Sequence, residues 1–325
     1  AEGNTHGWLD MAGALNHSCN LYFIQVAEKM SAEFFYNYYQ AFGLTQTTGI
    51  DLPYEAKGIS KTQQEMEQVE TDLYSTAFGQ SQKLTLIQMA AAVASTVNGG
   101  YLMTPYVVDN MTDDTGNVVW QAETDIKRQV VSEEVSEQIR AMMENNVGHT
   151  GTSNDLDYHG CASAYVAGYR IGGKSGTGEQ LDWKGAYKYR PDGDYRKAIS
   201  FAAILPADDP EILVLVMMDD PRWIFDYASQ IVAPVTGNII SQIATYLGIE
   251  RDASYDSNGS VEVPNAIGTR WTSAQVKMNA AGLSHRFVDT SDGDVVYQYP
   301  AGGTVVPAGS TVYLYTQSTT DATTT

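Results

Sequence analysis

The strongest constraint on the fold is a succession of three apolar runs of strand length, at residues 165–174, 198–205 and 212–219. Turn-forming stretches separate them, at Pro191-Asp192-Gly193 and at residues 206–210, so the economical arrangement is an antiparallel meander. A long helix is predicted next, over about residues 227–246 with Pro234 near its start, and should pack across the sheet. An antiparallel sheet flanked by helices is an α+β, or two-layer α/β, fold.

Apolar residues at helical spacing mark several segments upstream of this sheet. Residues 8–30 show the spacing on both sides of Asn16-His17-Ser18-Cys19-Asn20, whose side chains compete for backbone groups. We therefore expect a helix, a break and a second helix. Further helices are predicted over residues 34–42, 84–97 and 132–145. The segment 84–97 is apolar on nearly every face, so that helix should be central and buried.

The remaining stretches of this part are expected to be connections. Residues 54–72 are polar and predict a surface loop, and Ala77-Phe78-Gly79-Gln80 predicts a tight turn. Residues 101–120 predict a short β excursion around a hairpin turn at residues 113–117. Residues 148–160 predict a polar loop.

A change in composition near residue 251 predicts a second, smaller domain. We expect a main domain over residues 1–250, a linker over 251–259, an α+β module over 260–317 and a disordered Ser/Thr-rich tail over 318–325. In the module, Thr272 should cap a helix that ends at Gly282. Strands are predicted there at residues 261–263, 285–288, 295–299 and 311–315.

Composition excludes several classes of function. The net charge of −20 argues against a nucleic-acid partner and against adhesion to anionic membranes, because both need a basic face. No apolar run is long enough to span a bilayer. The 2 cysteines and 5 scattered histidines show no metal-ligand spacing, so we expect no metal and no cofactor. Cys19 and Cys161 could form a disulfide, but two buried free thiols are the better interpretation.

The stretch of residues 172–179 reads Gly-Gly-Lys-Ser-Gly-Thr-Gly-Glu and follows an apolar run. It offers a cation, hydroxyl groups and a backbone without Cβ atoms, so a ligand can lie flat against it with a carboxylate or an amide carbonyl. It is not a phosphate loop, because the spacing G-x-x-x-x-G-K-[ST] is missing. A glycine-rich turn with a solvated lysine is an equal alternative for this stretch alone.

Ser18-Cys19-Asn20 lies in the predicted break between the first two helices. One interpretation makes Ser18 the N-cap of the second helix. The other lets the Ser18 hydroxyl and the Asn20 amide protrude from the break into a cleft. Cys19, between them, is expected to point into the core, and a role as a nucleophile is the weaker interpretation.

Together these motifs resemble the transpeptidase domain of the high-molecular-weight class B penicillin-binding proteins. The motifs of that family are S-x-x-K, S-x-N and K-[ST]-G. Ser18-Cys19-Asn20 resembles the second motif and Lys174-Ser175-Gly176-Thr177 the third, in the order and separation of the family. The similarity extends over nearly all of residues 1–250, through Thr48-Gly49-Ile50-Asp51-Leu52-Pro53, Phe78-Gly79-Gln80, Asn98-Gly99-Gly100-Tyr101 and Met218-Asp219-Asp220-Pro221.

Residues 260–316 resemble a single PASTA domain. The resemblance rests on Val263-Pro264-Asn265, on Ala280-Ala281-Gly282-Leu283 and on the proline- and glycine-rich residues 300–309. Its place behind a transpeptidase domain implies a cell-division or sporulation enzyme of Gram-positive-like bacteria. Such an enzyme acts at the extracytoplasmic face of the cell membrane, anchored by an N-terminal segment that this sequence does not contain.

One departure from the family concerns the nucleophile. No serine here is followed three residues later by lysine, so the S-x-x-K motif is absent, and the chain starts at Ala1 without an initiator methionine. The resemblance implies that this motif precedes Ala1, together with the first helix, two strands and the central helix of the fold. We expect this chain alone to acylate nothing. We also expect it to be poorly stable, because an incomplete sheet exposes an apolar edge and face.

The chemistry that the resemblance implies is acyl transfer through a serine ester. The absent serine attacks the penultimate D-Ala carbonyl of a peptidoglycan stem peptide, or the ring of a β-lactam. Ser18 relays a proton toward the leaving group, with Lys174 nearby, and Asn20 binds the backbone amide of the substrate.

The same resemblance assigns substrate binding to the glycine-rich stretch. The hydroxyls of Ser175 and Thr177 hold the terminal carboxylate together with Lys174, and the N–H of Thr177 is an oxyanion-hole donor. Gly173 and Gly176 let the substrate lie against the stretch as an added β-strand.

Other functions compete with this one. A wall-binding or scaffold protein would keep the fold and the PASTA module without catalysis, and the sequence upstream of Ala1 distinguishes the two. An unrelated acidic binding protein would require the motif matches to be accidental.

Asp219-Asp220 suggests a metal site or an acid pair, although a turn at a strand end is the simpler interpretation. Stem peptides, β-lactams and other wall-synthesis proteins are the expected partners.

Overall fold

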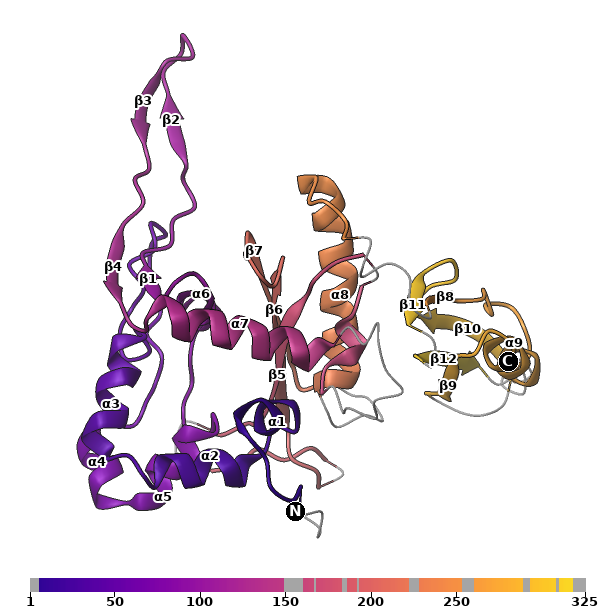
Figure 1. Cartoon of the computed structure of the whole chain (residues 1–325), viewed down its shortest axis with the longest axis horizontal. Helices are drawn as coiled ribbons and strands as arrows, with labels where there is room; N and C mark the ends of the chain where they lie inside the picture. The colour runs from indigo at the N-terminus through magenta and orange to yellow at the C-terminus, as the bar shows by residue number, and fades with distance from the viewer. Residues whose placement is uncertain are drawn as a thin grey trace. The chain divides into compact units, whose positions relative to one another are not determined.

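The computed structural model describes residues 6–148, 160–166, 168–182, 186–191, 193–221, 228–252, 260–288, 293–307 and 310–317 (Figure 1). The chain divides into two compact units: Ala1–Met143 with Ala207–Leu215, and Glu144–Pro206 with Val216–Thr325. Among the described residues no helix is long and apolar enough to cross a membrane. Most of the expected loop 148–160, most of the linker and the tail lie outside the described residues.

The first unit begins with the helix, break and helix that the sequence predicts. α1 (Met11–Asn16) starts at Asp10, whose carboxylate accepts a hydrogen bond from the Gly13 amide, and α2 (Asn20–Ala27) follows the break. α3 (Ala32–Ala41) begins two residues before the predicted start, because Ser31 caps it. Gly43 has a left-handed φ of 78° just after this helix, a conformation in which glycine commonly ends helices.

Two short helices replace the surface loop expected at residues 54–72, and that prediction is wrong. They are α4 (Gln63–Gln68) and α5 (Glu70–Ala77). The overlooked signal is a capping box, in which the Thr62 hydroxyl accepts from the Glu65 amide while the Glu65 carboxylate accepts from the Thr62 amide. Met66 and Leu73 from these helices are 2% and 6% exposed. They pack with Ala27 of α2 in one apolar cluster, so burial stabilises the segment as helix.

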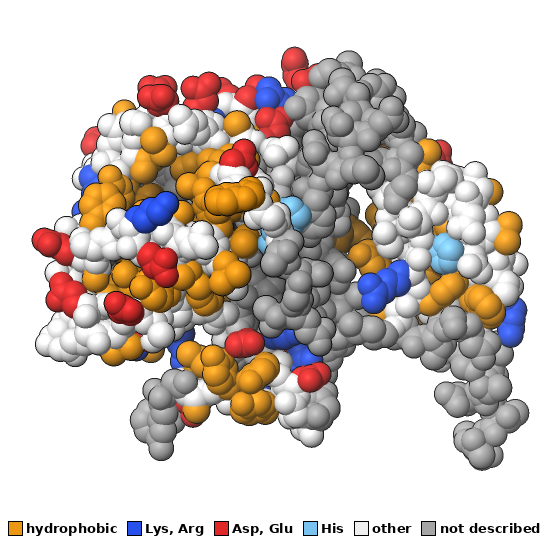
Figure 2. Space-filling view, turned by 60° about the horizontal axis from the view of Figure 1, so that its bottom comes forward, with side chains coloured by type: hydrophobic (Ala, Val, Ile, Leu, Met, Phe, Trp, Pro, Cys, Tyr) orange, Lys and Arg blue, Asp and Glu red, His pale blue; other side chains and the backbone are white. Residues whose placement is uncertain are grey.

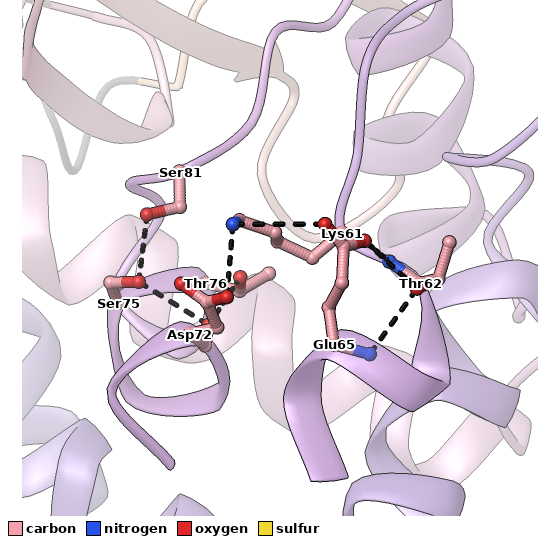
Figure 3. Close-up of polar contacts among 7 residues, drawn as sticks. All are labelled: Lys61, Thr62, Glu65, Asp72, Ser75, Thr76 and Ser81. Atoms are coloured by element: carbon pink, nitrogen blue, oxygen red, sulfur yellow. Dashed lines mark hydrogen bonds and ion pairs between the residues drawn. The ribbon is translucent and has the colours of Figure 1, made fainter. Parts of the chain in front are cut away.

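Polar contacts join the two helices and the turn that follows them (Figure 3). Lys61 pairs with Asp72 at 2.9 Å, and the same lysine lies 3.9 Å from Glu65. Ser75 of α5 shares a 2.8 Å hydrogen bond with Ser81, which has a left-handed φ of 59°. The tight turn at residues 77–80 is thus confirmed, with Gly79 at a φ of 94°.

α6 (Leu86–Val97) also begins with a capping box, formed by Thr85 and Gln88. The prediction of a central, buried helix holds for part of it: Gln88, Ala92, Ser95 and Val97 are buried, whereas Leu86 at its start is 48% exposed. α6 is followed by Gly99 and Gly100, both with a left-handed φ. A Cβ atom on Gly100 would lie 1.9 Å from the Val131 carbonyl oxygen, so only glycine fits there.

A long antiparallel ribbon follows α6. β1 (Tyr101–Met103) pairs with β4 (Ile126–Gln129), and β2 (Asn110–Thr112) pairs with β3 (Val118–Gln121). The hairpin turn at residues 113–117 is confirmed, with the Asp113 carboxylate accepting from the amides of Thr115 and Asn117. Figure 1 shows the ribbon extending away from the helices of its unit. α7 (Glu133–Val147) comes next and ends two residues later than predicted.

A sheet of three strands has the order β5-β6-β7, in agreement with the predicted meander. β6 (Lys197–Leu205) and β7 (Ile212–Asp219) match their predicted ranges. The first strand does not: β5 (Gly172–Glu179) starts seven residues later than expected. Gly168, with a left-handed φ of 82°, interrupts the apolar run, so extended pairing begins only at the glycine-rich motif.

α8 (Ala228–Leu247) packs against β5 and β6, as predicted, with Pro234 inside the helix (Figure 1). Phe201 and Ile204 of β6 are fully buried, as are Val232 and Ile240 of α8. Apolar burial between one helix and the central strand therefore forms the core of this sheet.

The C-terminal module has α9 (Trp271–Ala280) and β8 (Ser260–Glu262) paired with β11 (Val305–Pro307). Its larger sheet has the order β10-β12-β9, from β10 (Asp294–Tyr299), β12 (Thr311–Gln317) and β9 (Ser284–Phe287). Two predictions fail here. The helix starts at Trp271, after Arg270, so Thr272 is not its cap. β11 is a strand in a segment for which no strand is predicted.

Large apolar side chains reach the surface in both units, and Figure 2 shows several such patches on one face. β7 forms an edge of its sheet, and its apolar run is only half-buried, with Met217 46% exposed. The expected exposed apolar edge is thus confirmed, whereas low stability stays a prediction.

Replacing Met66 by alanine should lower the free energy of unfolding by about 2–5 kcal/mol, because the substitution leaves a cavity in the α4–α5 cluster. The exposed neighbour Gln64→Ala is the matched control and should change it by less than about 0.5 kcal/mol. Urea unfolding followed by circular dichroism measures both. Equal effects of the two substitutions would mean that α4 does not pack as described.

Candidate functional site

The Lys-Ser-Gly-Thr motif lies on an edge strand. β5 pairs with β6 from Gly172 opposite Ile204 to Glu179 opposite Lys197. In the sheet order β5-β6-β7, β5 is an outer strand, and no described strand pairs with its other edge. Gly176 and Thr177 are exposed, and Lys174 and Ser175 are half-buried. An edge strand presents backbone N–H and C=O groups to an extended ligand, so β5 can bind a peptide by strand addition.

The two glycines expected to admit a substrate have different surroundings. A Cβ atom on Gly173 would lie 2.4 Å from the Phe201 ring, and Gly173 is buried. Its lack of a side chain therefore serves packing on β6, and the prediction that it clears space for a substrate is wrong. A Cβ atom on Gly176 would meet only the Ser200 hydroxyl, at 2.9 Å, and Gly176 is exposed.

Strand alternation separates the motif side chains. Ser175 and Thr177 lie on one face of β5 and Lys174 on the other. The Thr177 hydroxyl oxygen accepts a hydrogen bond from the Ala228 amide at the start of α8, 3.2 Å away. Its own hydrogen can then be donated to an acceptor such as a carboxylate.

Lys174 has an environment that favours proton transfer. Its ammonium group donates to the Ser175 carbonyl oxygen at 2.8 Å. Burial lowers the pKa of Lys174 below its ordinary value, and the nearby Cys161 acts in the opposite direction. The ammonium group is thus partly removed from water, while the choice between a site lysine and a strand-end lysine stays a prediction.

Asn146 of α7 anchors this strand, and the sequence analysis overlooked it. It is fully buried, and its Nδ2 donates to the Gly173 carbonyl oxygen at 2.7 Å and to the Cys161 Sγ at 3.3 Å. Its backbone carbonyl accepts from the Cys161 amide at 2.9 Å. The only available signal was an asparagine on the apolar side of an amphipathic helix, where a polar side chain needs a partner.

Both cysteines are free, as the sequence analysis prefers, but only Cys161 is buried. Cys19 is half-buried, so the two thiols are not both buried, and the direction in which Cys19 points stays a prediction. Because Cys161 contacts Asn146 beside β5, the buried thiol belongs to the support of the strand.

Asp220 fixes the segment between β5 and β6. Its carboxylate accepts from Arg190 at 2.8 Å and from Arg196 at 3.0 Å, and its φ of 47° confirms a turn after β7. Burial raises the pKa of Asp220, but the hydrogen bonds and charges of the two arginines outweigh burial and lower it. The carboxylate is an ion-pair centre, which accounts for it without a metal or an acid pair.

Ser18 occupies a strained position in the break before α2. Its φ is 47°, in the left-handed region that non-glycine residues rarely adopt, and its side chain is exposed. The N-cap of α2 is Cys19, so the interpretation of Ser18 as a cap is wrong. Strain of this kind costs about 1–3 kcal/mol and is concentrated at functional sites.

Asn20 is the first residue of α2, and its side chain is exposed. The structure thus brings Ser18 and Asn20 together at one helix start in the first unit, and Lys174 to Thr177 on one strand in the second. That these two groups face each other across one groove stays a prediction.

Family comparison agrees with these features. The model of the penicillin-binding protein transpeptidase domain matches residues 2–241, so the chain belongs to that family. The model of the PASTA domain matches residues 261–318.

Individual relatives include stage V sporulation protein D of Bacillus subtilis, 33% identical over 95% of this chain and 46% of the relative. The peptidoglycan D,D-transpeptidase FtsI of Escherichia coli is 27% identical over 75% of this chain and 37% of its own length. The chain therefore spans less than half of the length of these relatives.

Solved structures support the same fold. Penicillin-binding protein 3 of Mycobacterium tuberculosis, complexed with aztreonam, has a TM-score of 0.64 at 23% identity, over 78% of this chain and 56% of that one. The transpeptidase domain of penicillin-binding protein 3 from Burkholderia pseudomallei has a TM-score of 0.62 at 25% identity, over 77% of this chain and 68% of that one.

Replacing Asn146 by alanine should lower the free energy of unfolding by about 1–3 kcal/mol, because the Gly173 carbonyl loses its buried donor. Hydrogen exchange at the amides of β5 should accelerate. Asn37→Ala, at an exposed asparagine of α3, is the matched control. Unchanged exchange along β5 would show that Asn146 does not anchor the strand.

Replacing Lys174 by methionine should remove a pH-dependent part of the stability. Because the pKa of Lys174 is lowered in the folded chain, the unfolded chain holds this proton more tightly. We compare the unfolding free energy of the unmodified chain with that of Lys174→Met. The difference should rise with pH between the lowered pKa of Lys174 in the folded chain and the ordinary pKa of lysine in the unfolded chain. Urea titrations from about pH 7 to about pH 10.5 measure the difference. A flat difference would contradict the burial of the ammonium, and Lys29→Met, at an exposed lysine, is the matched control.

Proposed function

We propose that this chain is part of a peptidoglycan D,D-transpeptidase that also reacts with β-lactams. The observation that carries the proposal is the Lys-Ser-Gly-Thr motif of a family member placed on an edge strand, with its lysine half-buried. Such a strand binds an extended peptide through its backbone, and a lysine with a lowered pKa moves protons.

In the proposed reaction, a serine of the S-x-x-K motif, outside this sequence, attacks the carbonyl carbon of the penultimate D-Ala. An oxygen–carbon bond forms, the amide carbon–nitrogen bond breaks, and the proton of the serine reaches the departing D-Ala amine. The acceptor amine of a second stem peptide then attacks the ester and frees the serine. Ser18 and Lys174 handle the proton in the first step.

The other motif residues bind the substrate in this proposal. The Ser175 and Thr177 hydroxyls donate to the terminal carboxylate, and the Thr177 hydroxyl is prepared for this by the Ala228 amide behind it. The exposed Gly176 lets the ligand approach the strand, and the Thr177 N–H is an oxyanion-hole donor. The exposed Asn20 amide binds the backbone of the substrate.

The proposal includes location and domain limits. Because its substrate is the cell wall, the full-length protein works at the extracytoplasmic face of the membrane, held by a segment outside this sequence. We place the transpeptidase domain at residues 1–250, the linker at 251–259 and the PASTA domain at 260–317, followed by the tail. Stem peptides and β-lactams are the proposed ligands, with other wall-synthesis proteins as partners.

A non-catalytic scaffold is the second candidate, because the transpeptidase fold and the PASTA module are both compatible with binding to the wall without acylation. The scaffold would use the same fold and PASTA module to bind the wall. An in-frame S-x-x-K motif in the gene upstream of Ala1 supports the enzyme, and a start codon near Ala1 supports the scaffold.

Labelling of the full-length gene product by a fluorescent penicillin tests the enzyme. Ser18→Ala and Lys174→Met should each slow acylation by about 10²–10⁴-fold, because each removes a group that moves the proton. Thr177→Val should chiefly weaken binding, since it deletes a carboxylate donor. The exposed Val276→Thr in the PASTA module is the control and should label at the unmodified rate.

The absence of labelling in a folded full-length product would refute the enzyme and leave the scaffold. Normal labelling of Ser18→Ala and Lys174→Met would refute the assigned roles, while the family membership would stand.

A further inference from the structure

The ribbon of β2 and β3 exposes an unusual amount of apolar surface. Every residue of both strands is exposed. The large apolar side chains among them are Met111, Val118, Val119 and Trp120, whose exposed fractions are 51%, 57%, 65% and 44%. Met111 and Trp120 are direct cross-strand partners, so their side chains lie on the same face. Exposed tryptophan and methionine are enriched at protein interfaces.

The ribbon is held in shape by bonds of its own. The Asp113 carboxylate accepts from the Thr115 hydroxyl at 2.7 Å and from the amides of Asn117 and Thr115 at 2.9 Å each. These hydrogen bonds, with that of the Thr115 hydroxyl first, lower the pKa of Asp113 to about 2. At its base, the Asp51 carboxylate accepts from the amides of Val107 and Val108 at 2.8 and 2.9 Å. A surface fixed in this way loses little conformational entropy when it binds.

The charged side chains between β1 and β4 have one sign. Residues 104–126 contain Asp109, Asp113, Asp114, Glu123 and Asp125, and neither lysine nor arginine. Anionic lipid would be repelled by these carboxylates, and a second copy of the same acidic ribbon would be repelled as well. A basic partner would be attracted.

The backbone offers a second means of attachment. β2 and β3 form a sheet of only two strands among the described residues, so each has an open edge. Open edges accept an added strand from a partner, and exposed apolar side chains beside them supply the burial.

From these observations we propose that the β2–β3 ribbon is a docking surface for a basic, apolar segment of another protein. The apolar band around Trp120 is buried in the complex, and the flanking carboxylates face lysine or arginine side chains of the partner. The docking is separate from the proposed transpeptidase chemistry, because the ribbon contains none of the motif residues.

Photocrosslinking in the cells that produce the protein tests this assignment. p-Benzoylphenylalanine is incorporated in place of Val119, and separately in place of Val118 so that one misfolded variant does not decide the result. Val276 in the PASTA module is the matched control position, since it is 67% exposed against 65% for Val119. The crosslinked peptide is then identified by mass spectrometry.

We expect crosslinks from the ribbon, and not from position 276, to a segment of another protein that is rich in apolar residues and carries net positive charge. Neutralising two ribbon carboxylates with Asp114→Asn and Glu123→Gln should lower the yield about two- to tenfold. The matched pair Glu134→Gln and Glu137→Gln, on α7, should leave the yield unchanged. Trp120→Ser should abolish the crosslink from position 118.

Four outcomes would overturn the proposal. They are a crosslink to lipid, a crosslink to a second copy of this chain, a crosslink to an acidic segment, and a yield no higher than at position 276. Penicillin labelling of the same cells separates this result from the proposed enzyme activity, since the ribbon variants should label normally.

Discussion

The close packing of β5 on β6 is the interaction on which the site depends. Gly173 lies against the Phe201 ring where no Cβ atom would fit, and Asn146 holds the Gly173 carbonyl from the opposite element. The backbone of the Lys-Ser-Gly-Thr segment is therefore fixed from behind while its outer edge stays open. A peptide that binds this edge meets a template already in place, so binding does not have to order the strand.

The helices and the meander could be predicted because their signals are local. Apolar periodicity marked α3, α7 and α8, and apolar runs marked β6 and β7. The prediction failed where a few residues decide the outcome. A capping box at Thr62 turned an expected loop into helix, and a single left-handed Gly168 moved the start of β5 to the motif itself.

The residues of the site fall into two similar groups, those that a sequence motif marks and those that only contacts in the folded chain reveal. The resemblance to the family assigned the site to Ser18, Asn20 and Lys174 to Thr177, and this assignment stays a prediction. It could not identify Asn146 or the partners of Asp220, since these side chains act through contacts between segments far apart in sequence. The role of Gly173 was misjudged for the same reason: the ring that excludes its side chain lies on another strand.

The backbone of Ser18 has a consequence for how such a sequence can change over time. Glycine accepts a left-handed φ at no steric cost, so glycine at this position would stabilise the fold by about 1 kcal/mol. That substitution would also delete the hydroxyl. Greater stability and the proposed proton relay therefore place opposite demands on position 18, and serine meets only the second.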